Sequence, residues 1–234
     1  VGKVFVQSES EVAAINMVYG AAASGKRAMT SSSSPGVALK QEGISYMAGA
    51  ELPAVVVNVM RGGPGLGSIQ PSQSDYYQAT RGGGNGDYRT IVLAPANIQE
   101  AVDLTQEAFD IADYYRNPVV VLADGTIGQM MEPIVWHDIP KRELGEKTWA
   151  ASGRNGREKN NFITSLLIDA ADCEDHNLHL EKKYEAMKEN EVRFEEYMTE
   201  DAEMIVVAYG TPARIAMSAI DDVRAEGVKV GLLR

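Results

Sequence analysis

The sequence has one cysteine, a shortage of basic residues and no long apolar run, and each shortage excludes a class of protein. The single cysteine, Cys173, can form no internal disulfide and cannot hold an iron–sulfur cluster, so it fits a protein of the reducing cytoplasm. The formal net charge of −11 argues against a nucleic-acid partner, because nucleic-acid binding needs a basic face. Apolar runs such as "AVVVNVM" are too short to span a bilayer, so we expect no membrane segment.

The composition is that of a globular protein, with 44% apolar and 24% charged residues in a chain of 234. The first residue is Val1, and the basic head and apolar stretch of a signal peptide do not follow it. The last residues, "VKVGLLR", are typical of a strand that stops with nothing after it. We therefore expect the chain to be a fragment of a longer protein.

Strand patterns and helix patterns alternate along the first 140 residues. Strands are expected at 3–7, 27–32, 53–60, 90–95 and 118–124, and helices at 10–24, 36–50 and 97–115. Gly25 is predicted to stop the first helix, and Ser34 and Pro35 are predicted to start the second as its N-cap and N1 residues. The alternation predicts an α/β fold, with a mostly parallel sheet and helices on both faces.

The composition changes after Pro140 and divides the chain into three parts, the first of which is a domain over residues 1–140. Residues 141–199 are polar and predict a linker with an exposed amphipathic helix at 178–199. Residues 200–234 predict a strand, a helix and a strand. Such a unit cannot enclose a core by itself, so we expect it to begin a second α/β domain.

Three patterns resemble binding motifs, and for each the plainer interpretation is preferred. The glycines of "RGGPGLGS" (61–68) are spaced as in a dinucleotide loop, but a proline interrupts them and no helix pattern follows. "CEDHNLH" (173–179) lacks a second cluster to complete a zinc site, so we expect a solvated loop. "ADGTIGQ" (123–129) matches a motif for Mg²⁺ and a diphosphate only in part, and a turn at Asp124 and Gly125 is favoured. No metal ligand is expected in this chain.

Glu9 and Glu11 both stand at the start of the first predicted helix, and they invite different interpretations. A carboxylate there complements the helix dipole, which suits Glu9 as a solvated cap. Glu11 is flanked by apolar and small residues, and burial would keep such a carboxyl partly protonated. A buried carboxyl at a strand–helix junction can donate a hydrogen bond to a heterocycle, so Glu11 is a candidate for that role.

Arg61 ends the most apolar predicted strand and enters a loop rich in glycine. It could be a plain surface arginine. It could also hold a substrate carboxylate by paired hydrogen bonds, with the glycines leaving room for the substrate. Ligands of such folds bind at the carboxyl ends of parallel strands, where Arg61 and the serines at 31–34 both lie.

Four segments together resemble a known family: "ESEVAAINMVYGAAASGKRAMTSSSSPG", "VVVNVMRGGPGLG", the Q-x-D of "SQSDYY", and "DGTIGQMMEP". They are similar to the alpha subunit of the 2-oxoacid:ferredoxin oxidoreductases, and most similar to the branched-chain type that acts on 2-oxoisovalerate (3-methyl-2-oxobutanoate). The resemblance covers nearly the whole chain. It implies that residues 1–140 are a pyrimidine-binding domain for thiamine diphosphate that lacks its upstream strand and loop. It also implies that residues 200–234 begin a truncated transketolase C-terminal-like domain.

The resemblance implies a role for each candidate residue. The glutamate nine residues before Gly20 is Glu11, which would contact N1′ of the aminopyrimidine and favour the imino tautomer that generates the attacking ylid. Ser33 and Ser34, at the same strand ends, are candidate cofactor-binding residues. The family's arginine for the substrate carboxylate falls on Arg61, and the loop after it, with Leu66, would lie near the substrate's side chain.

The resemblance also implies partners. The diphosphate and Mg²⁺ are expected on a beta subunit, and the iron–sulfur clusters on partner subunits, including gamma or delta subunits. The assembled complex, for which a dimer of the heteromer is expected, would convert a 2-oxoacid and coenzyme A to an acyl-CoA and pass electrons to ferredoxin. This chain alone is expected to be inactive. No nucleic acid or membrane is expected among its partners.

Several alternatives remain open from the sequence. One is the alpha subunit of a 2-oxoglutarate:ferredoxin oxidoreductase, and another is a different thiamine-diphosphate decarboxylase or synthase. A third is a non-catalytic assembly subunit. Relatives that prefer 2-oxoglutarate tend to carry hydroxyl residues in the loop after the arginine, whereas this loop has Leu66 and Ile69. An apolar loop favours a branched aliphatic substrate over one with a second carboxylate.

Overall fold

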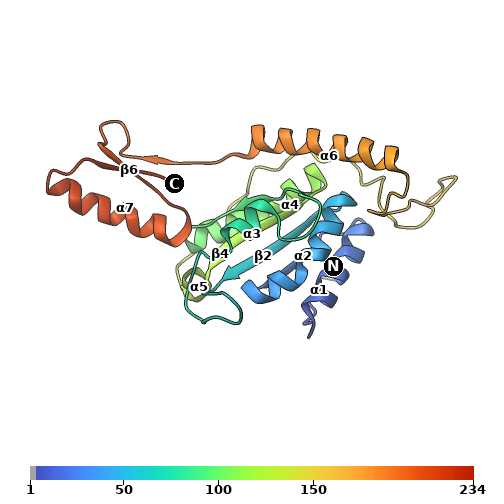
Figure 1. The fold of residues 1–234 in the computed structure, drawn as a ribbon, viewed down its shortest axis with the longest axis horizontal. Helices are drawn as coiled ribbons and strands as arrows, with labels where there is room; N and C mark the ends of the chain where they lie inside the picture. Colours follow the sequence, from blue (N-terminus) through green and yellow to red (C-terminus); the bar gives the residue numbers. More distant parts are fainter. Residues whose placement is uncertain (1–3) are drawn as a thin grey trace.

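The larger of two sheets forms the centre of the chain, in a computed structural model that describes residues 4–234. Its four strands are all parallel and lie in the order β1-β2-β4-β3. They are β1 Met29–Ser32, β2 Ala54–Met60, β3 Ile91–Leu93 and β4 Pro118–Asp124. The accompanying helices are α1 Glu11–Ala23, α2 Ser34–Gly49, α3 Tyr76–Arg81, α4 Ile98–Tyr115 and α5 Gly125–Gln129. The predicted α/β class with a parallel sheet is confirmed (Figure 1).

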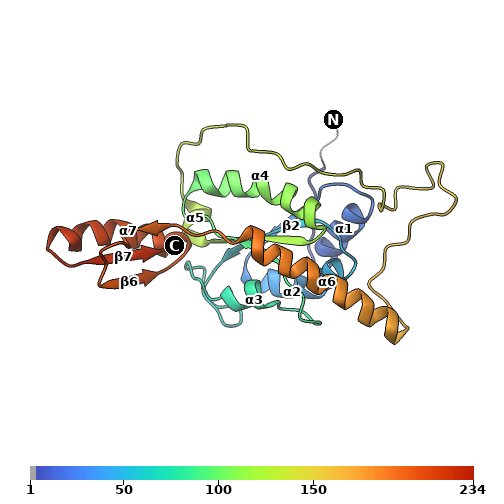
Figure 2. The same ribbon diagram turned by 90° about the horizontal axis from the view of Figure 1, so that it is seen from above.

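Helices cover both faces of this sheet, as expected for strands with unbroken β-branched runs. Figure 2 shows α4 on one face of β2 and β4, and α2 and α3 on the other. Every residue of β4 is buried, and so are five of the seven residues of β2. The main core therefore combines valines of both central strands with apolar side chains of α1, α2 and α4.

The start of the chain differs from the expectation. Residues 4–7 form no strand, and residue 3 of the expected strand at 3–7 lies outside the described residues. Val4 is 85% exposed and Phe5 is 95% exposed. In the described chain this short apolar run pairs with no neighbouring strand, so nothing satisfies its backbone groups in a sheet. The predicted stop of the first helix is confirmed, because α1 ends at Ala23 and Gly25 follows with a φ of +82°.

The helix expected at 178–199 is α6, and its bounds are Ala170–Glu191. It begins earlier because the Asp169 carboxylate accepts hydrogen bonds from the backbone N–H groups of Ala171 and Asp172. Its buried stripe consists of Leu180, Tyr184, Met187 and Glu191. This helix therefore packs on the core of the first domain instead of standing free (Figure 1).

The last part of the expected helix is an extended segment. Val192 and Phe194, two apolar residues of this segment, are 70% and 66% exposed. Arg193 lies between them and its guanidinium donates two hydrogen bonds to the Glu107 carboxylate on α4. The chain thus leaves the helix at Glu191 and runs toward the second sheet.

The long segment between α5 and α6 has no helix or strand, yet polar contacts hold it to the first domain. Figure 2 shows it passing along the outer side of α4 before it reaches α1. Lys147 donates to the Asp113 carboxylate at 2.5 Å, and the backbone N–H of Ala151 donates to the carbonyl of Ala23. The Arg116 guanidinium lies 4.6 Å from the centre of the Trp149 ring. The predicted linker is therefore fixed along much of its length.

The second, smaller sheet has the order β5-β7-β6, with β5 Glu196–Tyr197, β6 Met204–Val207 and β7 Val230–Leu233. The strands β6 and β7 are parallel and are joined by α7 Gly210–Ala225, as the sequence predicts, while β5 is antiparallel to β7. Arg214 pairs with Glu132 at 2.6 Å, and Gln73 donates from Nε2 to the carbonyl of Tyr209. These contacts hold α7 to the first domain. None of the helices in residues 4–234 combines the length and apolarity needed to cross a membrane.

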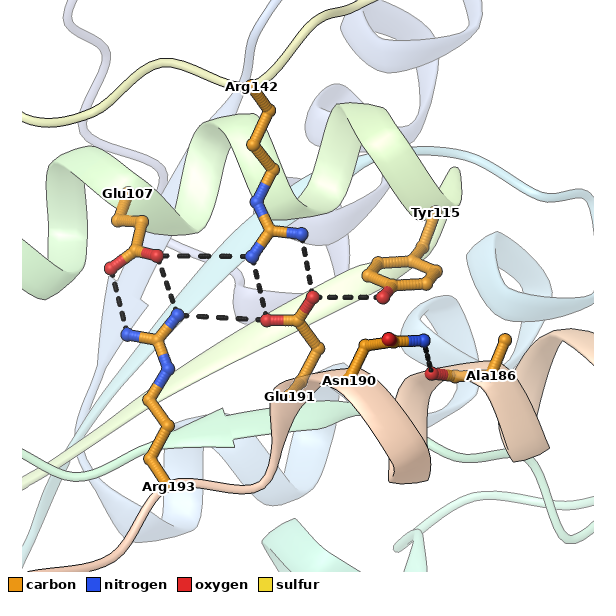
Figure 3. A network of polar contacts seen from close by, with 7 residues as sticks. All are labelled: Glu107, Tyr115, Arg142, Ala186, Asn190, Glu191 and Arg193. Atoms are coloured by element: carbon orange, nitrogen blue, oxygen red, sulfur yellow. Dashed lines mark hydrogen bonds and ion pairs between the residues drawn. The ribbon is translucent and has the colours of Figure 1, made fainter.

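A buried charge network fixes the end of α6 to α4 (Figure 3). The Glu191 carboxylate accepts two hydrogen bonds from Arg142, at 2.6 and 2.7 Å, and one from the Tyr115 hydroxyl at 2.9 Å. Burial acts to raise the pKa of Glu191, but the hydrogen bonds from Arg142 and Tyr115 and the charge of Arg193 outweigh it and leave this pKa below its usual range. Burial and the Glu191 carboxylate raise the pKa of Tyr115 to about 12.

The network makes a prediction about stability. Because the pKa of Glu191 is lower in the folded chain than in the unfolded chain, its contribution is complete above the unfolded pKa of about 4.3. It is lost as the pH falls from there through the folded pKa. Glu191→Gln is therefore expected to lower the free energy of unfolding at pH 7 by about 1–3 kcal/mol. It should also make the loss of stability in acid shallower, which denaturant titrations at several pH values would measure.

Glu185→Gln is the matched control on the same helix. Glu185 pairs with Lys188, and the side chains of both residues are more than half exposed. Such surface pairs contribute little, so we expect a change within about 0.5 kcal/mol. Equal effects of the two substitutions would contradict the importance of the buried network.

Candidate functional site

The carboxyl ends of β1, β2 and β4 meet at one edge of the sheet, where the predicted residues gather. The register pairs Ser32 with Asn58 and Met60 with Asp124, so the three strands end near one another. Arg61 follows β2 directly, and α2 begins two residues after β1. This is the edge at which parallel α/β folds bind ligands.

Glu11 is the first residue of α1, and its side chain lies against the start of α2. The N-cap of α1 is Ser10, whose hydroxyl accepts from the backbone N–H of Ala13, and the exposed Glu9 stands before it. Glu9 is therefore solvated, as expected, but it is not the cap. Glu11 is half-buried, and its Oε1 lies 2.9 Å from the position that a Cβ on Gly36 would take. A glycine at this position leaves room for the carboxylate.

Ser34 is the first residue of α2 and not its N-cap. Ser33 takes the N-cap position, with no hydrogen bond from its side chain, and Pro35 stands in the first turn. The Ser34 hydroxyl accepts from the backbone N–H of Arg61 at 3.0 Å and lies 3.3 Å from the carbonyl of the same residue. Ser34 is buried, and its hydroxyl joins the first turn of α2 to the end of β2.

The backbone of Arg61 is held at three points. Besides the contacts with Ser34, its carbonyl accepts from the Ser74 hydroxyl, and it pairs with Pro71 in an isolated β-bridge. Within residues 4–234 no carboxylate pairs with the Arg61 guanidinium, and its Nε is buried without a hydrogen-bond partner. A buried donor of this kind is costly unless a ligand satisfies it.

The glycine-rich loop after Arg61 closes on itself and extends into solvent. The N–H of Gly62 donates to the carbonyl of Gln70, and the N–H of Ser68 donates to the carbonyl of Gly62. Leu66 is 82% exposed and Ile69 is 78% exposed. The structure therefore places Leu66 on the rim of the site, where a second molecule could cover it.

The Q-x-D residues hold neighbouring elements together. Gln73 contacts the second sheet's unit through the carbonyl of Tyr209, as described above. Asp75 precedes α3, and its Oδ2 accepts from Nδ2 of Asn58, a buried residue of β2, at 2.9 Å. These two side chains position the segment after the loop.

Lys40 is a residue of this region that the sequence motifs do not indicate. Its side chain is 1% exposed, and its Nζ donates to Oγ1 of Thr30 at 2.7 Å and to the carbonyl of Ser31 at 3.1 Å. Burial lowers the pKa of Lys40, and the negative charge of Glu11 opposes this effect. A lysine between Val37 and Ile44, on the buried side of a helix, was the signal that could have revealed it.

The other patterns take structural roles. Oδ1 of Asp124 accepts from the N–H groups of Thr126 and Ile127 and so caps α5, which agrees with the turn expected there. "CEDHNLH" lies in α6 and is not a loop. His176 contacts the carbonyl of Gly49, and His179 contacts the Glu51 carboxylate, both at 2.7 Å. In the described part of the chain no cluster of three acidic, histidine or cysteine residues is placed to hold a metal ion.

Two helical glycines provide a test of the close approach at this site. Gly20 lies on α1, and no atom is within 4 Å of the position that a β-carbon would take there. A β-carbon on Gly36, in contrast, would overlap Ser32 Oγ and crowd the Glu11 carboxylate. Gly20→Ala is expected to stabilise the chain by about 0.5–1 kcal/mol through helix propensity. Gly36→Ala is expected to destabilise it by about 1–2 kcal/mol. Thermal unfolding would measure both, and equal stabilisation by the two substitutions would contradict this packing.

Comparison with known proteins identifies the family that the sequence motifs resemble, and the matches cover nearly the whole chain. The family described as pyruvate flavodoxin/ferredoxin oxidoreductase, thiamine-diphosphate-binding, matches residues 1–199, and pyruvate:ferredoxin oxidoreductase core domain II matches residues 202–234. The ketoisovalerate oxidoreductase subunit VorB of Methanothermobacter marburgensis is 58% identical over all of this chain, which spans 66% of that relative's length. The 2-oxoglutarate synthase subunit KorA of Methanothermobacter thermautotrophicus is 36% identical, and the match covers 100% of this chain and 69% of that relative's length.

A solved structure agrees with the fold. The 2-oxoglutarate:ferredoxin oxidoreductase from Magnetococcus marinus, with 2-oxoglutarate, coenzyme A and succinyl-CoA bound, superposes with a TM-score of 0.85 at 26% identity. The match covers 97% of this chain and 45% of that chain. The resemblance inferred from the sequence motifs is thereby confirmed. The chain belongs to the thiamine-diphosphate-binding family of the pyruvate flavodoxin/ferredoxin oxidoreductases.

Proposed function

We propose that this chain is the alpha-type subunit of a thiamine-diphosphate-dependent 2-oxoacid:ferredoxin oxidoreductase of the reducing cytoplasm. The complex converts 2-oxoisovalerate, coenzyme A and two oxidised ferredoxins to isobutyryl-CoA, carbon dioxide, a proton and two reduced ferredoxins. One observation carries the proposal. Glu11 and Arg61, which are 50 positions apart, both contact the first turn of α2, Glu11 beside Gly36 and Arg61 through Ser34.

The residues at this edge fit the aminopyrimidine end of thiamine diphosphate. Glu11 offers a half-buried carboxylate at this edge, and the absence of a side chain on Gly36 lets that carboxylate lie against the first turn of α2. When bound, the cofactor supplies a carbon nucleophile for the 2-oxo carbon and an electron sink for decarboxylation. Glu11 holds the proton that is shared with N1′ of the ring, and Ser33, at the N-cap of α2, lies at the same edge.

Arg61 binds the carboxylate of the 2-oxoacid. Its buried Nε lacks a partner among the described residues, and a carboxylate would satisfy it while pairing with the guanidinium. The hydrogen bonds of Ser34 and Ser74 fix its backbone, so the arginine is oriented before the substrate arrives. Its role is therefore to place the 2-oxo carbon beside the cofactor.

Other subunits complete the site. The Asp124 carboxylate is used to cap α5, which supports a diphosphate and Mg²⁺ site on a beta subunit. The single cysteine supports iron–sulfur clusters on gamma or delta subunits, from which ferredoxin takes the electrons. The heteromer forms a dimer in this proposal. Residues 1–140 act as the pyrimidine-binding domain, 141–199 as the linker, and 200–234 as the beginning of the second domain.

Glu11→Gln in the complex assembled with its partner subunits tests the catalytic role. Loss of a group that exchanges a proton typically reduces turnover about 10²–10⁴-fold, and we expect kcat to fall by this amount. Glu9→Gln is the matched control, because Glu9 stands two residues earlier and is exposed. Rates of ferredoxin reduction would be compared for both variants. Near wild-type turnover in Glu11→Gln would instead support a non-catalytic assembly role.

The loop after Arg61 supports a branched aliphatic substrate. Leu66 and Ile69 are exposed in this chain, and an apolar substrate side chain or a partner subunit would remove them from water. A second carboxylate, as in 2-oxoglutarate, would lose its hydration against Leu66 and Ile69 without a hydrogen bond from those side chains to replace it. One or two methyl groups change binding by only about 1–3 kcal/mol, so selectivity among aliphatic 2-oxoacids should be loose.

We expect kcat/KM of the complex to be higher for 2-oxoisovalerate than for 2-oxoglutarate. Leu66→Ser should lower kcat/KM for 2-oxoisovalerate about tenfold and leave the small value for 2-oxoglutarate nearly unchanged. Steady-state assays with both substrates measure this. A clear preference of the unmodified complex for 2-oxoglutarate would overturn the substrate assignment and leave the reaction type intact.

A further inference from the structure

Two consecutive side chains after the glycine-rich loop join the second sheet's unit to the candidate site. Gln73 donates from Nε2 to the Tyr209 carbonyl at 2.8 Å, across 136 positions of the sequence. Ser74, the next residue, donates from its hydroxyl to the Arg61 carbonyl at 3.3 Å. Both residues lie between β2 and α3 and belong to neither element, so these contacts and not secondary structure hold them.

Tyr209 contacts the first domain on both sides of the loop that begins at Arg61. Its ring packs against the small apolar cluster that contains Met60, the residue directly before Arg61. The centre of its ring also lies 5.7 Å from that of Tyr76, which follows the loop, and its carbonyl holds Gln73. One residue of the second sheet's unit therefore contacts both ends of the loop.

Gly210 allows the start of α7 to approach Gln73 closely. It follows Tyr209 and has a φ of +60°, in the left-handed region that favours glycine. A β-carbon on Gly210 would lie 3.2 Å from Nε2 of Gln73 and 3.5 Å from the carbonyl of Pro95. A larger residue would press on the Gln73 amide, so the glycine leaves the space that this hydrogen bond needs.

Two ion pairs hold the second sheet's unit to the first domain without Gln73. Arg214 on α7 pairs with Glu132 at 2.6 Å, and Arg234 after β7 pairs with Glu100 on α4. None of these four residues lies in the loop or in the segment after it. The unit is therefore docked by other contacts, and loss of the Gln73 hydrogen bond acts mainly on the loop.

We propose that Gln73 is a positioning residue for the 2-oxoacid, which acts through Ser74 and the backbone of Arg61. The inference rests on the function proposed above, in which Arg61 binds the substrate carboxylate. A guanidinium pairs with a carboxylate through two parallel hydrogen bonds, so its orientation decides how well it binds. Fixing the loop before the substrate arrives removes an ordering cost from binding. The second sheet's unit thus influences how firmly the substrate is held.

The test uses the complex assembled with its partner subunits and measures steady-state rates with 2-oxoisovalerate. Gln73→Leu removes the donor to the Tyr209 carbonyl with little change in size. The KM for the 2-oxoacid should rise about tenfold and kcat should change less than about twofold, because the ordering cost is the same for the ground state and the transition state. The affinity for thiamine diphosphate should stay unchanged, because the substitution leaves Glu11 in place.

Three variants control this measurement. Gln106→Leu is the same substitution at an exposed position of α4 and should leave KM unchanged. Arg214→Gln breaks the pair with Glu132 and tests general loosening of the second sheet's unit, and KM should stay within about twofold. Gln73→Glu keeps the size but has no proton to donate at neutral pH, so it should raise KM as Gln73→Leu does. It replaces that variant if Gln73→Leu does not assemble.

The Arg61→Lys background shows whether Gln73 acts through the arginine. Arg61→Lys removes the paired hydrogen bonds and should itself raise KM. Adding Gln73→Leu should then change KM by less than about twofold, because the guanidinium that Gln73 positions is gone.

The outcomes separate this inference from the proposed function. An unchanged KM in both Gln73 variants, with a clear rise in Arg61→Lys, overturns the role of Gln73 and leaves that of Arg61 standing. A rise that persists undiminished in the Arg61→Lys background, or that Arg214→Gln reproduces, also overturns it, and so does a fall in kcat with KM unchanged. If Arg61→Lys itself leaves KM unchanged, the role of Arg61 in the proposed function fails first.

Discussion

The parallel pairing of β2 with β4 is the interaction on which the rest of the structure depends. Seven consecutive residue pairs, from Ala54 with Pro118 to Met60 with Asp124, align the carboxyl ends of the two strands. Both strands are almost wholly buried, so a shift in register would expose valines and move Arg61 away from the common edge. The helices on the two faces follow from this burial, and so does the position of every candidate site residue.

The first turn of α2 brings candidate site residues together at that edge. Ser34 uses its hydroxyl to hold the backbone of Arg61, and Gly36 leaves space for the Glu11 carboxylate. One turn later Lys40 returns to the same edge and places a positive charge under β1. The start of α2 therefore holds the Glu11 carboxylate and the backbone of Arg61, and α2 itself supplies the buried ammonium of Lys40. Hydrogen bonds and close packing, and not loop flexibility, set their arrangement.

Electrostatic contacts at the other end of the domain hold the segment before α6 in place. The long segment before α6 has no secondary structure, and several of its apolar side chains are exposed, so burial alone does not hold it. Arg142 within it and Arg193 after it converge on Glu191, and Arg193 also pairs with Glu107 of α4 (Figure 3). Two arginines for one buried carboxylate, with a tyrosine hydroxyl as a further donor, keep that carboxylate ionised. These ion pairs therefore fix the short segment that connects α6 with the second sheet.

The sequence by itself determined the α/β class, the order of the main elements, the stop at Gly25 and the candidates Glu11 and Arg61, because hydrophobic period, turn residues and family motifs are local signals. Tertiary structure decided the rest. Val4 and Phe5 have the pattern of a strand but pair with no strand among residues 4–234, and the exit from α6 depends on the distant Glu107. Lys40 stands on the apolar side of its helix in the sequence, but only folding gives its ammonium the partners Thr30 and Ser31 of β1. Charges and hydrogen-bond partners far apart in sequence meet only in the folded chain, so no local pattern could reveal them.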